Sequence, residues 1–159
     1  MKVFITGGAG FIGSHLAERH LTMGDGVSII DNLSTGSITN VQHLESNPKF
    51  NCVIDDVLNV DVMRTLVRET DLIYHLAAAV GVDFIIDNPL QSLTTNIRGT
   101  EIVLELANED KKRVVLASTS EIYGKKNGHV PFKEDSDRIL GPTTVIRWSY
   151  STSKAVDEL

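Results

Sequence analysis

Short apolar runs alternate with helical stretches along the chain. The apolar runs predict strands over residues 2–6, 27–31, 51–54, 71–76 and 114–118. Between them, apolar residues recur at helical spacing over 11–23, 61–67 and 89–107, and a last helix starts near Tyr150. Strands that alternate with helices in this way predict an α/β fold with a parallel sheet covered on both faces.

Several residues mark the expected ends of these elements. Gly24 supplies a stop for the first helix, Asp61 is the expected N-cap of the second, and Pro89 fits the first turn of the third. Residues 127–144 show no periodicity and contain two glycines and two prolines, which predicts a long loop.

The composition of the 159 residues is that of a globular protein, with 42% hydrophobic and 23% charged residues. Fifteen Lys and Arg against 21 Asp and Glu give a net charge of −6 without a basic stripe, so nucleic acid is not an expected partner. No apolar run approaches the ~18 residues of a membrane span, and the start of the chain does not resemble a signal peptide. The single Cys52 suits a reducing compartment. We therefore predict one cytoplasmic domain, residues 1–159, that does not bind membranes.

A glycine-rich turn, Thr6–Gly13 (TGGAGFIG), joins the first predicted strand to the first helix. Gly7 permits a tight turn, Gly10 lets backbone N–H groups approach a diphosphate, and Gly13 lets the helix pack closely on the sheet. The positive end of the helix dipole then faces the phosphates. A strand, three spaced glycines and a helix in this order predict a dinucleotide-binding site; the alternative is a turn that binds nothing.

Asp31, at the end of the second predicted strand, indicates which dinucleotide is bound. Its carboxylate can accept hydrogen bonds from the ribose hydroxyls and would repel a 2′-phosphate. Residues 32–40 contain no Arg or Lys that could neutralise such a phosphate. We therefore predict NAD rather than NADP; the alternative is that Asp31 only caps a following helix.

Tyr150 and Lys154 are four residues apart and would share one face of the last helix. An ammonium group near a phenol, together with the positive nicotinamide ring, would lower the phenol pKa from its usual value of ~10. Tyr150 could then remove a hydroxyl proton while hydride leaves the same carbon. This spacing is common by chance and gains weight only in a chain that also carries the dinucleotide turn.

Seven segments together resemble the extended short-chain dehydrogenase/reductases, in the group of nucleotide-sugar epimerases, dehydratases and decarboxylases. They are Thr6–Gly13, Asp31–Gly36 (DNLSTG), Asp55–Val57 (DDV), His75–Ala78 (HLAA), Asn96, Ser118–Gly124 (STSEIYG) and Tyr150–Lys154. The resemblance implies a Rossmann-type doubly wound sheet, NAD as cofactor, and an NDP-sugar, in first place a UDP-sugar, that is transiently oxidised at C4.

The resemblance also implies roles for single residues. Thr119 would hydrogen-bond the sugar hydroxyl that Tyr150 deprotonates, and Lys154 would hold the nicotinamide ribose. Ser120 and Glu121 match acid–base positions of some members, so the implied catalytic set is Tyr150, Lys154, Thr119, Ser120 and Glu121. The implied cofactor-binding set is Gly7, Gly10, Phe11, Ile12, Gly13, Asp31, Asn32, Ser34, Thr35, Gly36, Asp56, Val57, Leu76, Ala77, Ala78, Asn96, Ser118, Tyr150 and Lys154.

The reaction stays open at this point. The run Thr119–Glu121 is similar to that of nucleotide-sugar decarboxylases and GDP-mannose dehydratases, but the latter usually take NADP, against which Asp31 argues. The dTDP-glucose dehydratases carry Asp at the position of Ser120. Simple 4-epimerases often lack an acid at the position of Glu121.

Each of these polar residues also has a purely structural interpretation. Residues 118–120 could be ordinary polar residues at a strand end, and Glu121 could be solvated. His75 ends an apolar strand and is expected to be packed rather than catalytic. The acids at 55, 56 and 61 are typical of helix caps, and no metal site is predicted.

Members of the family continue beyond the Tyr/Lys helix, whereas this chain ends at Leu159. The strand that ends near Ala117 is therefore expected at an exposed sheet edge, and Ala155, Val156 and Leu159 are expected to lack packing partners. Three hypotheses follow: part of a longer enzyme that binds NAD but turns over poorly, a subunit completed by self-association (a dimer) or a second chain, and a non-catalytic nucleotide-binding module.

Overall fold

A five-stranded parallel sheet is formed by the part of the chain that the structure describes. The structure is a computed structural model that describes residues 1–125 and 131–159, and for Val82 only the backbone. The strands are β1 Lys2–Thr6, β2 Gly26–Asp31, β3 Phe50–Ile54, β4 Leu72–His75 and β5 Arg113–Leu116. Their order is β3-β2-β1-β4-β5, and every neighbouring pair is parallel. The predicted α/β class and doubly wound sheet are confirmed.

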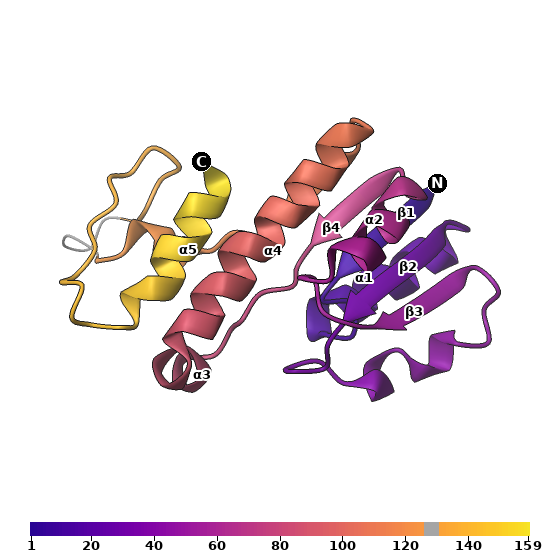
Figure 1. The fold of residues 1–159 in the computed structure, drawn as a ribbon, viewed down its shortest axis with the longest axis horizontal. Helices are drawn as coiled ribbons and strands as arrows, with labels where there is room; N and C mark the ends of the chain where they lie inside the picture. The colour runs from indigo at the N-terminus through magenta and orange to yellow at the C-terminus, as the bar shows by residue number, and fades with distance from the viewer. Residues whose placement is uncertain (126–130) are drawn as a thin grey trace. The chain divides into compact units, whose positions relative to one another are not determined.

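Helical segments follow each strand along the chain (Figure 1). They are α1 Phe11–Thr22, α2 Val60–Arg68, α3 Val82–Asp87, α4 Pro89–Glu109 and α5 Trp148–Glu158, with short 3₁₀ segments η1 Ile38–Asn40, η2 Gln42–Leu44 and η3 Ser120–Tyr123. No described helix is long and apolar enough to cross a membrane. The sequence did not predict α3 or the 3₁₀ segments, because each is too short to show a helical period. Part of the predicted loop, residues 127–130, lies outside the described residues.

The cap of α2 differs from the prediction. The side chain of Asn59, not that of Asp61, accepts the hydrogen bond from the N–H of Val62, at 3.5 Å. Asp61 instead lies in the first turn, where its negative charge is favourable next to the positive end of the helix dipole. Pro89 begins α4 as predicted.

The described residues form two compact units, which we treat separately. The first comprises Met1–Ala78 and Arg98–Ala117 and contains the whole sheet. The second comprises Ala79–Ile97 and Ser118–Leu159 and contains α3, η3 and α5. Helix α4 contributes residues to both.

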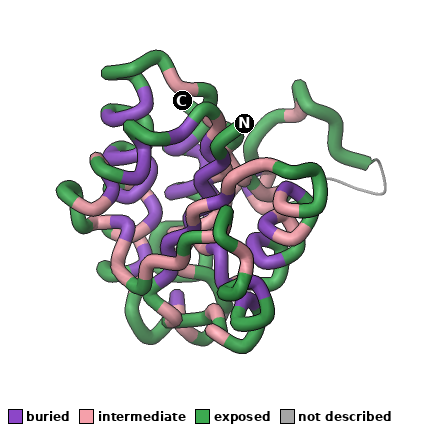
Figure 2. Tube along the Cα trace, turned by 90° about the vertical axis from the view of Figure 1, so that its right-hand side faces the viewer, coloured by how far each residue is buried: buried purple, intermediate pink, exposed green. Residues whose placement is uncertain are grey.

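The core of the first unit has two layers, one on each face of the sheet. On one face, Phe4 of β1 packs with α2 and α4 residues such as Met63 and Ile102. On the other face, the neighbouring β1 residues Val3 and Ile5 pack with a cluster that includes Ala17 of α1. All of these side chains are at most 2% exposed and belong to the buried positions drawn in purple in Figure 2. The alternation follows from the two-residue period of a strand.

The order of the strands fixes where a ligand can approach the sheet. β1 lies between β2 and β4, so the chain leaves β1 in one direction and later returns to its other side. The carboxyl ends of β1 and β4, at Thr6 and His75, meet at this switch point, the usual ligand site of doubly wound sheets.

The predictions about unpartnered residues near the chain end are only partly right. β5 lies at the edge of the sheet, and Val115 is 44% exposed. Val156 and Leu159 are exposed as predicted. Ala155, however, is buried in the second unit, since it lies on the same face of α5 as the buried Ser151.

Candidate functional site

The turn after β1 is tightly tied to the sheet. Gly7 has a φ of 69°, in the left-handed region that glycine adopts without strain. Its N–H donates to the carbonyl of Ile30 in β2 at 2.9 Å. A Cβ atom at Gly7 would lie 2.9 Å from the backbone nitrogen of Ala77, so the turn also lies directly against the chain that leaves β4. Only glycine meets both conditions.

The start of α1 presents unused donors. The N-cap is Gly10, which has no side chain to cap the helix, and the first turn contains no acidic residue. The first N–H bonded within the helix is that of Ser14, to the carbonyl of Gly10 at 3.0 Å. Within the described residues the N–H groups of Phe11, Ile12 and Gly13 have no acceptor. Three such groups at the positive end of a helix form a binding site for an anion.

The packing of α1 against the turn depends on Gly13. A Cβ atom there would overlap the carbonyl oxygen of Gly7 and lie 2.7 Å from the Cα of Gly8. Phe11 and Ile12, by contrast, are 79% and 62% exposed. The helix start is thus held against the turn by its glycines, and its donors fit the diphosphate of a dinucleotide.

Asp31 lies beside this turn at the end of β2 and is 8% exposed. Its Oδ2 accepts from the N–H of Ala9 at 2.9 Å, and its Oδ1 accepts from the N–H of Leu33 at 2.8 Å. A Cβ atom at Gly36 would lie 2.9 Å from both carboxylate oxygens. An ionised carboxylate has about four acceptor positions, so two remain for ribose hydroxyls.

Other predicted cofactor positions lie in the loops that follow β2 and β3 in the same unit. Asn32 donates from Nδ2 to Oδ2 of Asp56 at 2.9 Å, which links the ends of β2 and β3. Val57 is 6% exposed, whereas Ser34 and Thr35 are exposed.

The end of β4 is organised by the buried hydroxyl of Thr6. Its Oγ1 accepts from the N–H groups of Leu76 and Ala77, both at 3.1 Å, and lies 2.8 Å from Nδ1 of His75. Nε2 of His75 lies 3.2 Å from the hydroxyl of Thr100. His75 is therefore packed, as predicted, and Thr6 fixes the backbone at Leu76 and Ala77.

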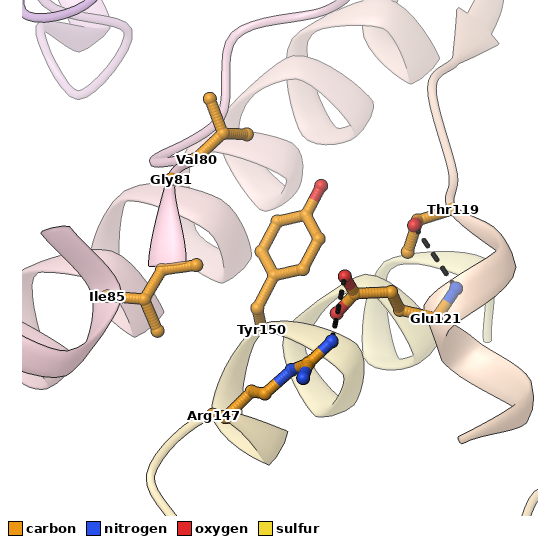
Figure 3. A pocket seen from close by; sticks show the side chains of 7 residues that line it. All are labelled: Val80, Gly81, Ile85, Thr119, Glu121, Arg147 and Tyr150. Atoms are coloured by element: carbon orange, nitrogen blue, oxygen red, sulfur yellow. Dashed lines mark hydrogen bonds and ion pairs between the residues drawn. The ribbon is translucent and has the colours of Figure 1, made fainter. Parts of the chain in front are cut away.

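The second unit has a cavity of about 260 Å³ that gathers three of the five predicted catalytic residues (Figure 3). The ring of Tyr150 stands between Val80 and Gly81 on one side and the side chains of Thr119 and Glu121 on the other. Seven residues line the cavity: Val80, Gly81, Ile85, Thr119, Glu121, Arg147 and Tyr150. Ser120 and Lys154 are not among them.

Helix α5 carries Tyr150 and is fixed by buried polar contacts within the second unit. Ser151 donates from its hydroxyl to the carbonyl of Glu121 at 2.6 Å. Asn96 accepts from the N–H of Ala79 at 2.7 Å and donates to the hydroxyl of Ser153 at 3.1 Å. Asn96 therefore positions the helix that carries Tyr150. At the other end of η3, the hydroxyl of Thr119 accepts from the N–H of Glu121 at 3.2 Å, and the hydroxyl of Ser118 donates to Glu158 of α5.

Lys154 is paired with an acid that the sequence analysis did not predict. Its Nζ donates to Oδ2 of Asp157 at 2.9 Å, and both side chains are at most 3% exposed. The pKa of Tyr150 is raised above its usual value, first because burial disfavours the phenolate and then because Glu121 and Asp157 are negatively charged. The expected lowering of this pKa by Lys154 together with the nicotinamide ring stays a prediction, and the ammonium group of Lys154 is paired with Asp157.

The sequence matches the profile described as GDP-mannose 4,6 dehydratase over residues 4–159, which is nearly the whole chain. The chain belongs to the GDP-mannose 4,6-dehydratase family. This agrees with the predicted resemblance to nucleotide-sugar epimerases, dehydratases and decarboxylases.

Relatives of this family member are nucleotide-sugar enzymes. It is 42% identical over 157 residues to a UDP-N-acetyl-alpha-D-glucosaminuronate decarboxylase of Bacillus cytotoxicus, which covers 99% of the chain and 48% of the relative. It is 41% identical to UDP-glucuronic acid decarboxylase 1 of Arabidopsis thaliana, over 84% of the chain and 29% of that protein. Among solved structures, the chain is similar to the dTDP-glucose 4,6-dehydratase DesIV of Streptomyces venezuelae, which was solved with NAD bound. The two are 31% identical with a TM-score of 0.86, and the match covers 99% of this chain and 49% of that structure. The chain thus spans about half the length of these proteins or less.

The sequence analysis missed two charged residues of the second unit, Asp157 and Arg147, and the uncharged lining residues Val80, Gly81 and Ile85. Asp157 follows Lys154 by three positions on α5, and this spacing could have predicted the pair. Arg147 lies in an irregular stretch before α5, where no periodicity relates it to Glu121 or Tyr150. Only the folded chain shows that these three side chains share a cavity.

Proposed function

We propose that residues 1–159 are the NAD-binding part of an enzyme that decarboxylates a UDP-linked uronic acid through transient oxidation at C4. The observation that carries this proposal is the uncapped start of α1, where three N–H groups have no acceptor among the described residues and Asp31 lies beside the same turn. The choice of decarboxylation rests on the relatives at 42% and 41% identity, both of which are uronic acid decarboxylases by name.

Different residues of the chain would bind different parts of the cofactor. The N–H groups at the start of α1 would hold the diphosphate, and Asp31 would hold the ribose hydroxyls. Bound NAD would supply a hydride acceptor for C4 of the sugar and a positive ring charge that favours the phenolate of Tyr150. NAD is favoured over NADP because Asp31 is an acid and residues 32–40 contain no Arg or Lys. NAD in the related dehydratase structure supports this choice.

We propose catalytic roles for five residues of the second unit, three of which line its cavity. Tyr150 takes the proton of the C4 hydroxyl, and Thr119 hydrogen-bonds that oxygen. A 4-keto uronic acid is a β-keto acid, so the bond between C5 and the carboxylate breaks and its electron pair moves onto the C4 oxygen. Glu121 then returns a proton to C5. Tyr150 returns its proton to the C4 oxygen while the hydride returns from the reduced cofactor to C4, which leaves the cofactor oxidised and gives a UDP-pentose. Lys154 orients the nicotinamide ribose, and Ser120 remains a second candidate for proton transfer.

The remaining predicted positions surround the cofactor in this proposal. Asp56 and Val57 border the adenine, residues 76–78 follow the cofactor along the end of β4, and Asn96 positions α5. We further propose self-association as a dimer, which light scattering of the purified protein would test.

Turnover by the protein at its full natural length tests the function directly. With NAD and UDP-glucuronate we expect release of CO₂ and formation of a UDP-pentose. Tyr150→Phe should abolish turnover but leave the affinity for NAD nearly unchanged. Tyr123→Phe is the matched control, since Tyr123 does not line the cavity and its hydroxyl bonds Glu134. A product that retains the carboxylate, whether epimerised or dehydrated, would contradict decarboxylation, and an unchanged rate in Tyr150→Phe would contradict the role of Tyr150.

A further inference from the structure

Arg147 brings a positive charge into the cavity that holds Tyr150. It lies at the N-cap position of α5, and its side chain is 60% exposed. Figure 3 shows its guanidinium group next to the carboxylate of Glu121, on the same side of the cavity as the Cβ of Tyr150. The ion pair joins Nη2 of Arg147 and Oε1 of Glu121 at 3.9 Å, which is too long for a hydrogen bond.

The guanidinium group is therefore able to bind a further acceptor. Arginine carries five N–H donors, and in the described part of the chain those of Arg147 make this one ion pair and no hydrogen bond. The other lining side chains apart from Glu121 are uncharged at neutral pH, because the pKa of Tyr150 is raised. The cavity thus contains one cation with unused planar donors and one anion 3.9 Å from it.

We infer that Arg147 binds the carboxylate of the sugar and so selects uronic acids over neutral sugars. The inference rests on the proposed function and identifies the residue that recognises the carboxylate of the substrate. A guanidinium group binds a carboxylate through two parallel hydrogen bonds, a geometry that a neutral hydroxymethyl group cannot reproduce. Without Arg147, the negative charge of Glu121 would repel a carboxylate in the same cavity.

The charge balance determines which kinetic constant Arg147 affects. The bound carboxylate is negative before the reaction, and its charge moves to the C4 oxygen when CO₂ leaves. A cation fixed at the carboxylate therefore stabilises the bound substrate at least as much as the transition state. Arg147 contributes to KM and to selectivity, and only slightly to kcat.

The test compares the binding of UDP-glucuronate and UDP-glucose, which differ only in having a carboxylate or a hydroxymethyl group at C6. Calorimetric titrations use the protein at its full natural length and its Arg147→Gln and Arg147→Lys variants, each loaded with NADH, which cannot accept a hydride and so prevents turnover of the ligand. We expect the wild type to prefer UDP-glucuronate, and Arg147→Gln to lose about 10- to 100-fold of that affinity while its affinity for UDP-glucose stays within about twofold. Arg147→Lys should retain part of the preference, since it keeps the charge without the planar fork.

The matched control is Arg19→Gln, which removes an exposed positive charge from the last turn of α1, in the first unit, and should leave both affinities unchanged. Circular dichroism confirms that each variant is folded. The inference would be overturned if Arg147→Gln lost affinity equally for both ligands or kept the wild-type preference for UDP-glucuronate. It would also be overturned if the wild type bound UDP-glucuronate no more tightly than UDP-glucose. A protein that shows the expected binding but releases no CO₂ would contradict the proposed function and leave the role of Arg147 standing.

Discussion

Replacing Gly13 by alanine tests the close contact between α1 and the glycine turn. The new methyl group would overlap the carbonyl oxygen of Gly7 and lie 2.7 Å from the Cα of Gly8, whereas carbon atoms normally approach to about 3.5–4.0 Å. Both obstacles are backbone atoms, so the helix itself must move. Overpacking of this kind costs up to about 3 kcal/mol, and the better helix propensity of alanine offsets about 1 kcal/mol. We expect a net loss near 2 kcal/mol, or about 4–8 °C in Tm.

Gly10→Ala is the matched control at the same turn. The nearest obstacle to its Cβ is the carbonyl oxygen of Gly7 at 3.2 Å, and its φ of −76° suits alanine. Urea unfolding followed by circular dichroism should therefore place Gly10→Ala within about 0.5 kcal/mol of the wild type, since the loss of unfolded-state entropy offsets the tight contact. Equal stability of Gly13→Ala and the wild type would refute the close packing, as would an equal loss in both variants.

Three further substitutions address the second unit. Asp157→Ala leaves the buried ammonium group of Lys154 without its partner and should lower the free energy of unfolding in urea by about 3 kcal/mol. A double variant that also carries Lys154→Met should recover much of this loss. If Asp157→Ala is as stable as the wild type, the buried pair is disproved. Because the pKa of Tyr150 is raised in the folded protein, the stability that this group contributes is complete below its unfolded pKa of ~10 and is lost as the pH rises through its folded pKa. Glu121→Gln should lower the pKa of Tyr150, which is measured by tyrosinate absorbance as the difference from Tyr150→Phe. An unchanged pKa would exclude Glu121 as a cause of the shift. Ser149 has a buried hydroxyl that lacks a partner within the described residues, so Ser149→Ala should leave the free energy of unfolding unchanged or slightly higher. A loss of unfolding free energy above about 1 kcal/mol would contradict the absence of a hydrogen bond.

The first unit was largely predictable from the sequence because its signals are local. β1 has the predicted bounds, Lys2–Thr6, and the other strands differ from prediction by one or two residues at an end. The glycine turn and Asp31 follow directly from adjacent strands, so their spacing in the chain fixes their proximity in the fold. The cap of α2 was assigned to Asp61 instead of Asn59 because both are good caps two positions apart.

The second unit was less predictable because its contacts join distant segments. Tyr150 and Glu121 line the same cavity although 29 positions separate them, and residues 79–97 add Val80 and Ile85. The local spacing of Tyr150 and Lys154 correctly placed both on one helix, but the sequence analysis did not predict that Asp157 pairs with the ammonium group of Lys154. Electrostatic partners depend on side-chain orientation, which helical spacing alone does not determine.

A calorimetric titration of the folded chain with NAD, and in parallel with NADP, tests the central claim most directly. We predict one bound NAD per chain through the N–H groups at the start of α1 and the carboxylate of Asp31, with NADP bound at least about tenfold more weakly because its 2′-phosphate meets that carboxylate. Binding of neither dinucleotide, by heat or by thermal shift, would contradict the claim, and tighter binding of NADP would contradict the role of Asp31.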